Sequence, residues 1–446
     1  MHPGIHKFQL NNHRLLLDIN SGSLHVLDEM TDAVLDIFDG TNKQEVFAAL
    51  AASYSAEELS GAVAELEGLI ERGLLFAALP DVPPTFSGTP IVKAICLHVA
   101  HDCNLRCGYC FAGTGDFGHE RGMMSIETAI QAVEYLIEHS GTRRHCEIDF
   151  FGGEPLLNMS VLREATSYIR RRERETGKIF KLTLTTNAML LDDANIAFLN
   201  DNNISLVLSL DGREAVHDRM RPDAGGNPTY KRILRNIRRA VDARNGEDYY
   251  LRGTFTALNC AFAADVAAMA DEGFKLLSME PVVGKDADYV ITEAHLPKLF
   301  AEYEKLAADY LRRKRLDKDF EFFHFNMDVH NGPCLTKRLS GCGAGHEYLA
   351  VTPEGDLYPC HQFVGREEFR LGDVWAGIAR TDIPPKFRGN HVLNKEACRE
   401  CWARFHCSGG CHANAELING SIDKPYEIGC ELQKKRLECA LMIQAD

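Results

Sequence analysis

The chain has 446 residues, of which 45% are hydrophobic and 25% are charged, and its formal net charge at pH 7 is −15. This length predicts more than one domain, and the negative charge argues against general nucleic-acid binding, because phosphate contacts need clustered lysine and arginine. No run of about 18 uncharged apolar residues appears, and Met1–Lys7 lacks the layout of a signal peptide, so we expect a cytoplasmic protein without a membrane partner.

The first 80 residues are expected to form a unit of their own. Three short strands and then three helices are predicted, at Phe8–Leu10, Leu15–Asp18, Leu24–Leu27, Thr31–Phe38, Lys43–Ser53 and Ala56–Gly73. This order is typical of a winged-helix-like module, and the scarcity of basic residues favours a peptide docked on a sheet edge over DNA. The pattern resembles the elements that bind leader peptides in pathways that modify ribosomally made peptides. A purely structural N-terminal cap is the alternative.

A linker at 81–90 leads to alternating strands and helices. The expected strands lie at Ala94–Val99, Cys146–Phe150, Lys181–Thr185, Ser205–Leu210, Tyr249–Leu258 and Leu276–Met279. Helical patterns separate them, the clearest beginning after the candidate N-cap Ser125. Six such units predict an α/β domain over 91–315, with a parallel sheet curved into a partial (β/α)6 TIM-type barrel and its chemistry at the C-terminal strand ends.

Three cysteines directly after the first expected strand have the spacing C-x3-C-x2-C. These residues, Cys103, Cys107 and Cys110, can hold three corners of a 4Fe-4S cluster and leave the fourth iron open. Zinc fingers use a different spacing of paired elements. The loop resembles that of the radical S-adenosylmethionine (SAM) enzymes. The resemblance implies that the three cysteines are catalytic, that the open iron binds SAM, and that the cluster supplies the electron that cleaves SAM to a 5'-deoxyadenosyl radical.

The same resemblance implies SAM contacts where the following strands end. Gly152 and Gly153 can expose backbone groups to a close ligand, and Glu154 is expected to accept from the methionyl amine. The other expected contacts are Tyr109 against the adenine, Asn187 and Ser209 toward the ribose and the carboxylate, and Arg221 paired with that carboxylate. Packing elsewhere remains the alternative for Tyr109, and a surface ion pair remains the alternative for Arg221.

A second group of cysteines lies toward the C-terminus, in residues 330–446. They are Cys342, Cys360, Cys398, Cys401, Cys407, Cys411 and Cys430. Their layout resembles the SPASM extension of radical SAM enzymes, which carries two auxiliary 4Fe-4S clusters. The resemblance implies that Cys398, Cys401, Cys407 and Cys430 hold one cluster, while Cys342, Cys360 and Cys411 supply three ligands to the other.

The fourth ligand of that second auxiliary cluster stays open. Cys334, eight residues before Cys342, could complete the set, or the iron could stay vacant and accept a substrate thiolate. A zinc ribbon is the alternative for the four-cysteine run, and it would leave Cys430 and the pair Cys342 and Cys360 without a task.

Several stretches look most like maturases of cysteine-rich ranthipeptides, the six-cysteine (SCIFF) type. They are 101–107, 111–117, 332–334 and 340–345. This resemblance implies an enzyme that joins a cysteine sulfur to a carbon as a thioether in a precursor peptide with a leader. It also implies SAM, three 4Fe-4S clusters and an external one-electron reductant of the flavodoxin or ferredoxin type.

Two other functions are weighed against thioether formation. Anaerobic sulfatase maturases form formylglycine with an Asp directly after the cysteine that corresponds to Cys360, and this chain has His361 there. A non-catalytic peptide-binding metalloprotein is the third hypothesis. The combination of the three-cysteine loop with the Gly-Gly-Glu turn argues against it.

Overall fold

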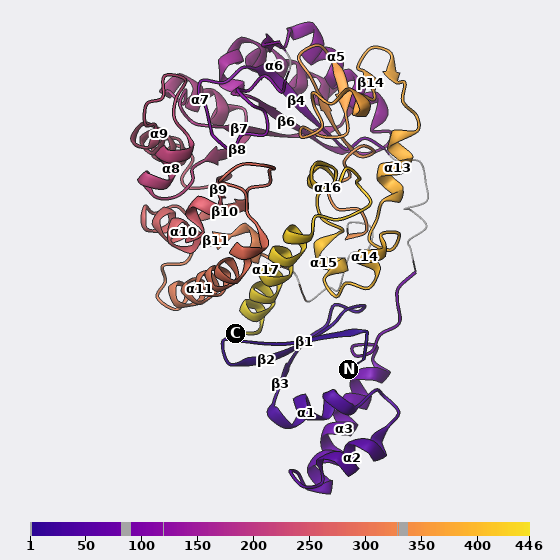
Figure 1. The fold of residues 1–446 in the computed structure, drawn as a ribbon. Coiled ribbons are helices and arrows are strands. Elements are labelled where there is room, and N and C mark those ends of the chain that lie inside the picture. The colour runs from indigo at the N-terminus through magenta and orange to yellow at the C-terminus, as the bar shows by residue number, and fades with distance from the viewer. Residues whose placement is uncertain (1, 82–90, 119, 328, 330–337) are drawn as a thin grey trace.

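A long curved sheet runs through the body of the protein, and a smaller unit made by the N-terminal residues lies at one end (Figure 1). The computed structural model describes residues 2–81, 91–118, 120–327, 329 and 338–446. Most of the expected linker therefore lies outside the described residues. Within these ranges, every helix is too short or too polar to cross a lipid bilayer.

The N-terminal unit contains all six of its expected elements. They are β1 Ile5–Leu10, β2 His13–Asp18, β3 Leu24–Leu27, α1 Glu29–Ile37, α2 Lys43–Leu50 and α3 Ala56–Glu71. The strands form an antiparallel sheet in the order β1-β2-β3, so β3 is an edge strand. Helix α3 begins with a capping box, in which the Ser55 hydroxyl accepts from the Glu58 backbone and the Glu58 carboxylate accepts from the Ser55 backbone.

The six expected strands of the partial barrel are confirmed. They are β4 Ala94–His101, β6 His145–Gly152, β7 Ile179–Thr186, β8 Ile204–Ser209, β9 Tyr249–Phe255 and β10 Leu276–Pro281. They lie side by side in that order, and every neighbouring pair is parallel. The expected extension of the fifth strand to Leu258 is wrong, because the Thr256 hydroxyl accepts from the Leu258 backbone and starts a short 3-10 turn.

Side chains alternate along these strands and give the sheet two different faces. In β6 the buried residues Cys146, Ile148 and Phe150 alternate with the more accessible Glu147 and Asp149. Helices lie along the outer side of the sheet (Figure 1): α5 Ile126–His139, α6 Met159–Thr176, α7 Asp193–Asp201, α8 Glu214–Met220, α9 Tyr230–Asp242, α10 Phe262–Asp271 and α11 Leu296–Lys314. The apolar positions pack beneath them, and the inner face is left more polar.

The C-terminal region continues the barrel sheet, which the sequence analysis did not anticipate. Strand β12 Tyr348–Val351 pairs in parallel with β4, on the side away from β6. Three short antiparallel strands follow, β13 Asp356–Tyr358, β14 Gly372–Asp373 and β15 Gly377–Ile378. At its far edge the sheet ends with β11 Glu321–Phe322, and β5 Gly122–Met123 pairs with β4. Strand β13 pairs with β12, and β12 pairs with β4. Because Cys360 comes two residues after β13, it lies near β4.

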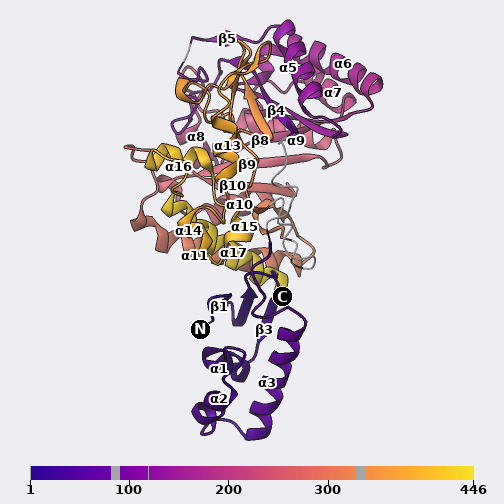
Figure 2. The same ribbon diagram turned by 90° about the vertical axis from the view of Figure 1, so that its right-hand side faces the viewer.

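The rest of the C-terminal region is helical. Its helices are α13 Ile383–Gly389, α14 Glu396–Arg399, α15 Arg404–Cys407, α16 His412–Asn419 and α17 Glu427–Ala445. Helix α17 packs along α11 and also contacts β1 and β3 of the N-terminal unit (Figures 1 and 2). The C-terminal helix therefore lies between the barrel and the N-terminal sheet.

The N-terminal unit contacts the cysteine-rich region through specific side chains. The rings of His6 and Trp402 stack with centroids 3.8 Å apart, and His6 Nε2 lies 3.1 Å from a Glu438 carboxylate oxygen. Arg404 donates to the Asn20 side-chain oxygen at 2.6 Å. Since Trp402 directly follows Cys401, the N-terminal unit lies against one of the cysteine sets.

Replacing His6 with alanine should loosen this contact. A stacked ring pair contributes about 1 kcal/mol, so backbone amides of β1 and of α17 near Glu438 should exchange hydrogen about fivefold faster. Hydrogen exchange read by mass spectrometry measures the change. Lys43→Ala, which removes the ion pair with Glu67 on α2 and α3, is the control. Unchanged exchange in β1 and α17 of the His6 variant would contradict the contact.

Candidate active site

The three-cysteine loop follows β4 directly and is held by backbone contacts to the segment after α8. Arg106 and Gly108 donate through their backbone N–H groups to the carbonyls of Pro222 and Met220, each at 2.8 Å. All three thiols are half-buried. Burial, followed by the negative charge of Glu154, raises the pKa of Cys103 to about 12, and burial raises the pKa of Cys107 to about 11.

These thiols fit a cluster better than a single metal ion. Cys107 and Cys110 both contribute to the raised pKa of Cys103, so the three sulfur atoms lie within electrostatic range of one another. The described residues contain no group of three His, Cys, Asp or Glu side chains close enough for one ion. In a 4Fe-4S cluster each thiolate binds a different iron, and an iron centre offsets the thiolate charge that burial disfavours.

The turn Gly152-Gly153-Glu154 packs against the start of the cysteine loop. A Cβ on Gly152 would lie 2.2 Å from the carbonyl oxygen of Ala100, and a Cβ on Gly153 would lie 2.2 Å from that of Asp102. Gly153 and Glu154 also donate to these two carbonyls, each at 2.8 Å. The glycines thus permit a close backbone contact with the loop, and these two N–H groups are already bonded within the protein.

The Glu154 carboxylate joins the ends of two strands. It is fully buried, and it accepts from the Leu156 backbone at 3.0 Å, the Thr186 hydroxyl at 2.7 Å and the Asn187 backbone at 2.8 Å. Burial raises its pKa to about 7 although these hydrogen bonds oppose the rise. A carboxylate can accept about four hydrogen bonds, so one position, on Oε2, is left for a ligand.

Asn187 lies between Glu154 and the cysteine loop. Its side-chain amide donates to the Asn104 side chain at 2.7 Å and lies 3.6 Å from Cys103 Sγ. The structure therefore brings Cys103, Glu154 and Asn187 together. Ser209 ends β8 without a side-chain hydrogen bond to any described residue, and it pairs in register with Arg252 of β9.

Tyr109 and Arg221 form a second group together with Asp211. The Tyr109 hydroxyl donates to Asp211 at 2.6 Å and accepts from Arg221 at 2.9 Å. Arg221 is 7% exposed, so the surface ion pair considered for it is wrong. Its Nε has no hydrogen-bond partner within the described part of the chain. Asp211 lies two residues after the end of β8, at the edge of the sheet where the SAM contacts are expected.

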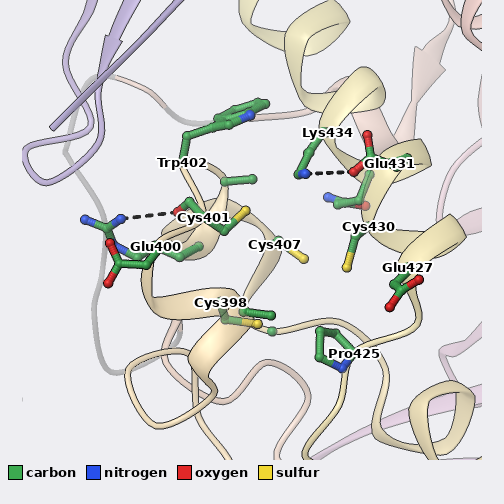
Figure 3. A pocket seen from close by; sticks show the side chains of 15 residues that line it. Cys398, Glu400, Cys401, Trp402, Cys407, Pro425, Glu427, Cys430, Glu431 and Lys434 are labelled. Carbon is green, nitrogen blue, oxygen red and sulfur yellow. Dashed lines mark hydrogen bonds and ion pairs between the residues drawn. The ribbon is translucent and has the colours of Figure 1, made fainter. Parts of the chain in front are cut away.

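Four of the C-terminal cysteines line one cavity of about 390 Å³. Figure 3 shows the thiols of Cys398, Cys401, Cys407 and Cys430 facing a common space. Burial, followed by the charges of the other three thiols, raises the pKa of Cys430 to about 12. Trp402 and Arg404 line the same cavity and contact the N-terminal unit. The four residues expected to share one cluster are therefore neighbours.

The other expected set, Cys342, Cys360 and Cys411, also lies close together. Burial and then the charges of Cys411 and Cys342 raise the pKa of the Cys360 thiol. Cys360 is 8% exposed, whereas Cys342 and Cys411 are exposed. Cys334 lies outside the described residues, so the structure leaves its part in this set untested.

His361 connects this set to the three-cysteine loop. Its ring centroid lies 5.0 Å from that of Phe151 and 5.7 Å from that of Phe111, the residue after Cys110. Its Nδ1 lies 3.2 Å from the Tyr348 hydroxyl. Burial, assisted by the charge of Arg252, lowers its pKa to about 4. A neutral imidazole and two aromatic rings thus separate the two sets of thiols.

Comparison with known proteins agrees with this arrangement. The Radical SAM superfamily model matches residues 97–250. The cysteine-type anaerobic sulfatase-maturating enzyme of Clostridium novyi (strain NT) is 24% identical over 364 residues, which cover 76% of this chain and 92% of the relative.

Two solved structures resemble the fold. "Native anSMEcpe with bound AdoMet and Cp18Cys peptide" has a TM-score of 0.64 at 21% identity and covers 79% of this chain and 98% of its own. Streptococcus suis SuiB bound to S-adenosylmethionine has a TM-score of 0.53 at 15% identity and covers 96% of this chain and 98% of its own.

The family match includes both the three-cysteine loop and the Gly-Gly-Glu turn, and the structural likeness extends the shared fold beyond them. Residues 97–250 therefore form a radical SAM domain, in a chain related to the anaerobic sulfatase-maturating enzymes.

Proposed function

We propose that this chain is a radical SAM enzyme that modifies a ribosomally made peptide by joining a cysteine sulfur to a carbon as a thioether. The observation that carries the proposal is the proximity of two thiol sets on either side of His361, Phe111 and Phe151. A peptide segment bound there would have its acceptor carbon near the loop of Cys103 and its cysteine near Cys360.

The residues around the three-cysteine loop suit SAM. A 4Fe-4S cluster held by Cys103, Cys107 and Cys110 would supply the electron that cleaves SAM to the 5'-deoxyadenosyl radical. Glu154 has one acceptor position left, and a neighbouring ammonium group would favour its ionised form against the effect of burial.

The other proposed SAM contacts are side chains near the three-cysteine loop that can still bind a ligand. Arg221 has an unpaired Nε within the described residues and can bind the SAM carboxylate, with Ser209 and Asn187 as further polar contacts. The Tyr109 hydroxyl is held by Asp211 and Arg221, which leaves its ring to lie against the adenine. Asp211 acts here as a positioning residue.

Two auxiliary clusters complete the proposed centre. Cys398, Cys401, Cys407 and Cys430 would hold one, and Cys342, Cys360 and Cys411 would supply three ligands to the other, with Cys334 or a substrate thiol as the fourth. An external one-electron reductant of the flavodoxin or ferredoxin type would reduce the enzyme. The pairwise proximity of the thiols supports both assignments.

The N-terminal unit is proposed to bind the leader of the precursor peptide. Its strand β3 is an edge strand, which can pair with an extended peptide through backbone hydrogen bonds. About a fifth of this chain has no counterpart in the anSMEcpe structure, which covers 79% of it, whereas SuiB covers 96%. This difference in coverage agrees with a separate recognition element for the peptide.

Formylglycine formation is the second candidate, and the relationship to a cysteine-type sulfatase-maturating enzyme favours it. The Asp that the resemblance would place after Cys360 is replaced by His361, whose pKa is lowered to about 4 by burial and by Arg252. This difference at the centre of the two thiol sets is the reason for preferring the thioether.

The product of the reaction separates the two candidates. Reconstituted enzyme, SAM and dithionite should be incubated without oxygen with the cysteine-containing peptide encoded beside the gene. A thioether lowers the peptide mass by two hydrogens and leaves one thiol fewer to react with iodoacetamide, and tandem mass spectrometry measures both. A product that has lost its sulfur would contradict the thioether and support formylglycine.

Replacing Cys411 with alanine should separate SAM cleavage from peptide modification. Removal of this thiol disrupts only the set around Cys360, so 5'-deoxyadenosine should still form at a reduced rate while the thioether is lost. Liquid chromatography with mass spectrometry quantifies both products. In the comparison variant Cys107→Ala neither product should form, whereas Cys146→Ala, in the barrel core, should make both. A Cys411 variant that crosslinks at the wild-type rate would contradict the assigned role.

A further inference from the structure

Arg252 is an exposed cation on the inner face of the barrel sheet. Along β9, the residues Tyr249, Leu251, Gly253 and Phe255 are buried, and Arg252 lies on the alternate face. The charge of Arg252 lowers the pKa of His361, which follows β13, and the pKa of Glu280 at the end of β10. That face is therefore directed toward the C-terminal region. An exposed guanidinium is therefore presented to whatever lies between the barrel and the C-terminal region.

The guanidinium of Arg252 is near a carboxylate but is not bonded to it. Within the described ranges, no side chain forms a hydrogen bond or ion pair with it. The neighbouring carboxylate of Glu280 is already engaged, because it lies 3.0 Å from His324 and 3.5 Å from Arg436. Arg252, Arg436 and Glu280 together leave one positive charge uncompensated.

The register of the sheet places Arg252 at the level of the expected SAM contacts. Arg252 pairs with Ser209 of β8 on one side and with Ser278 of β10 on the other. Ser209 is one of the positions proposed for SAM. A substrate residue that reaches the reacting carbon near SAM would therefore pass close to this guanidinium.

We infer that Arg252 is a specificity-determining residue that binds the carboxylate of an aspartate or glutamate in the substrate peptide, close to the carbon that reacts. The inference rests on the proposed peptide-modifying function. A guanidinium offers a fork of N–H donors that matches a carboxylate, and such charge-assisted pairs are stronger than neutral hydrogen bonds. In a chain of net charge −15, an acidic peptide would otherwise be repelled, so one uncompensated cation selects where it binds.

Peptide binding to the reconstituted enzyme with SAM tests the inference. Three rhodamine-labelled peptides of the sequence Gly-Cys-Gly-Gly-X-Gly, with Glu, Gln or Lys at X, serve as probes, and fluorescence anisotropy gives their Kd values. The wild type should bind the Glu peptide about tenfold more tightly than the Gln peptide, as expected for a charge-assisted pair.

Charge reversal at the same position supplies the decisive comparison. Arg252→Gln should bring the ratio of the two Kd values close to one, and Arg252→Glu should bind the Lys peptide more tightly than the Glu peptide. Arg252→Lys should keep a preference for Glu because it keeps the charge. Arg235→Gln, on the exposed face of α9, is the matched control and should preserve the wild-type ratio.

The binding results test the inference, and SAM cleavage tests the proposed function. Equal Kd values for the Glu and Gln peptides in the wild type, no binding of either peptide, or a ratio that survives in Arg252→Gln would overturn it. Because each ratio compares two peptides on one variant, a general loss of stability or of SAM affinity cancels. A wild-type enzyme that fails to cleave SAM would contradict the proposed function instead.

Discussion

The close backbone contact between the Gly152-Gly153 turn and the end of β4 determines how the candidate SAM site is built. A Cβ on Gly152 would strike the carbonyl oxygen of Ala100 in β4, and a Cβ on Gly153 would strike that of Asp102 just after it. This contact holds Glu154 where its carboxylate joins Thr186 and Asn187 of the next strand end, and Asn187 in turn lies against Cys103. One buried carboxylate thus connects the ends of β6 and β7 to the loop that would hold the cluster.

The second structural constraint is the continuation of the barrel sheet into the C-terminal region. Pairing of β12 with β4 places Cys360 and His361 beside the aromatic residues Phe111 and Phe151. The ion pair between Lys93 and Glu347, at 2.6 Å, reinforces the junction where β4 and β12 begin. The three-cysteine loop and Cys360 therefore each follow a strand of one sheet, which sets the distance between them.

Local patterns in the sequence predicted most of the elements. Strand-like runs separated by helical patterns predicted the six barrel strands, and the N-cap Ser125 is confirmed by the hydrogen bond that its hydroxyl accepts from Thr128. The family resemblance implied how the C-terminal cysteines are grouped, and the thiols of each expected set lie near one another within the described residues. The β4 to β12 pairing and the stacking of His6 on Trp402 join residues about 250 to 400 positions apart, and such contacts leave no periodic signal in a single sequence. Arg252 is similar, because only the folded sheet reveals that no side chain in the described part of the chain forms a hydrogen bond or ion pair with its guanidinium.

The central claim is that the cluster held by Cys103, Cys107 and Cys110 keeps one iron free for SAM, and electron paramagnetic resonance tests it most directly. The protein should be reconstituted without oxygen, reduced with dithionite and measured before and after SAM is added. Binding of SAM to the open iron should shift the g-values of the reduced signal. A spectrum that SAM leaves unchanged, or the finding that the bound metal is zinc, would contradict the account.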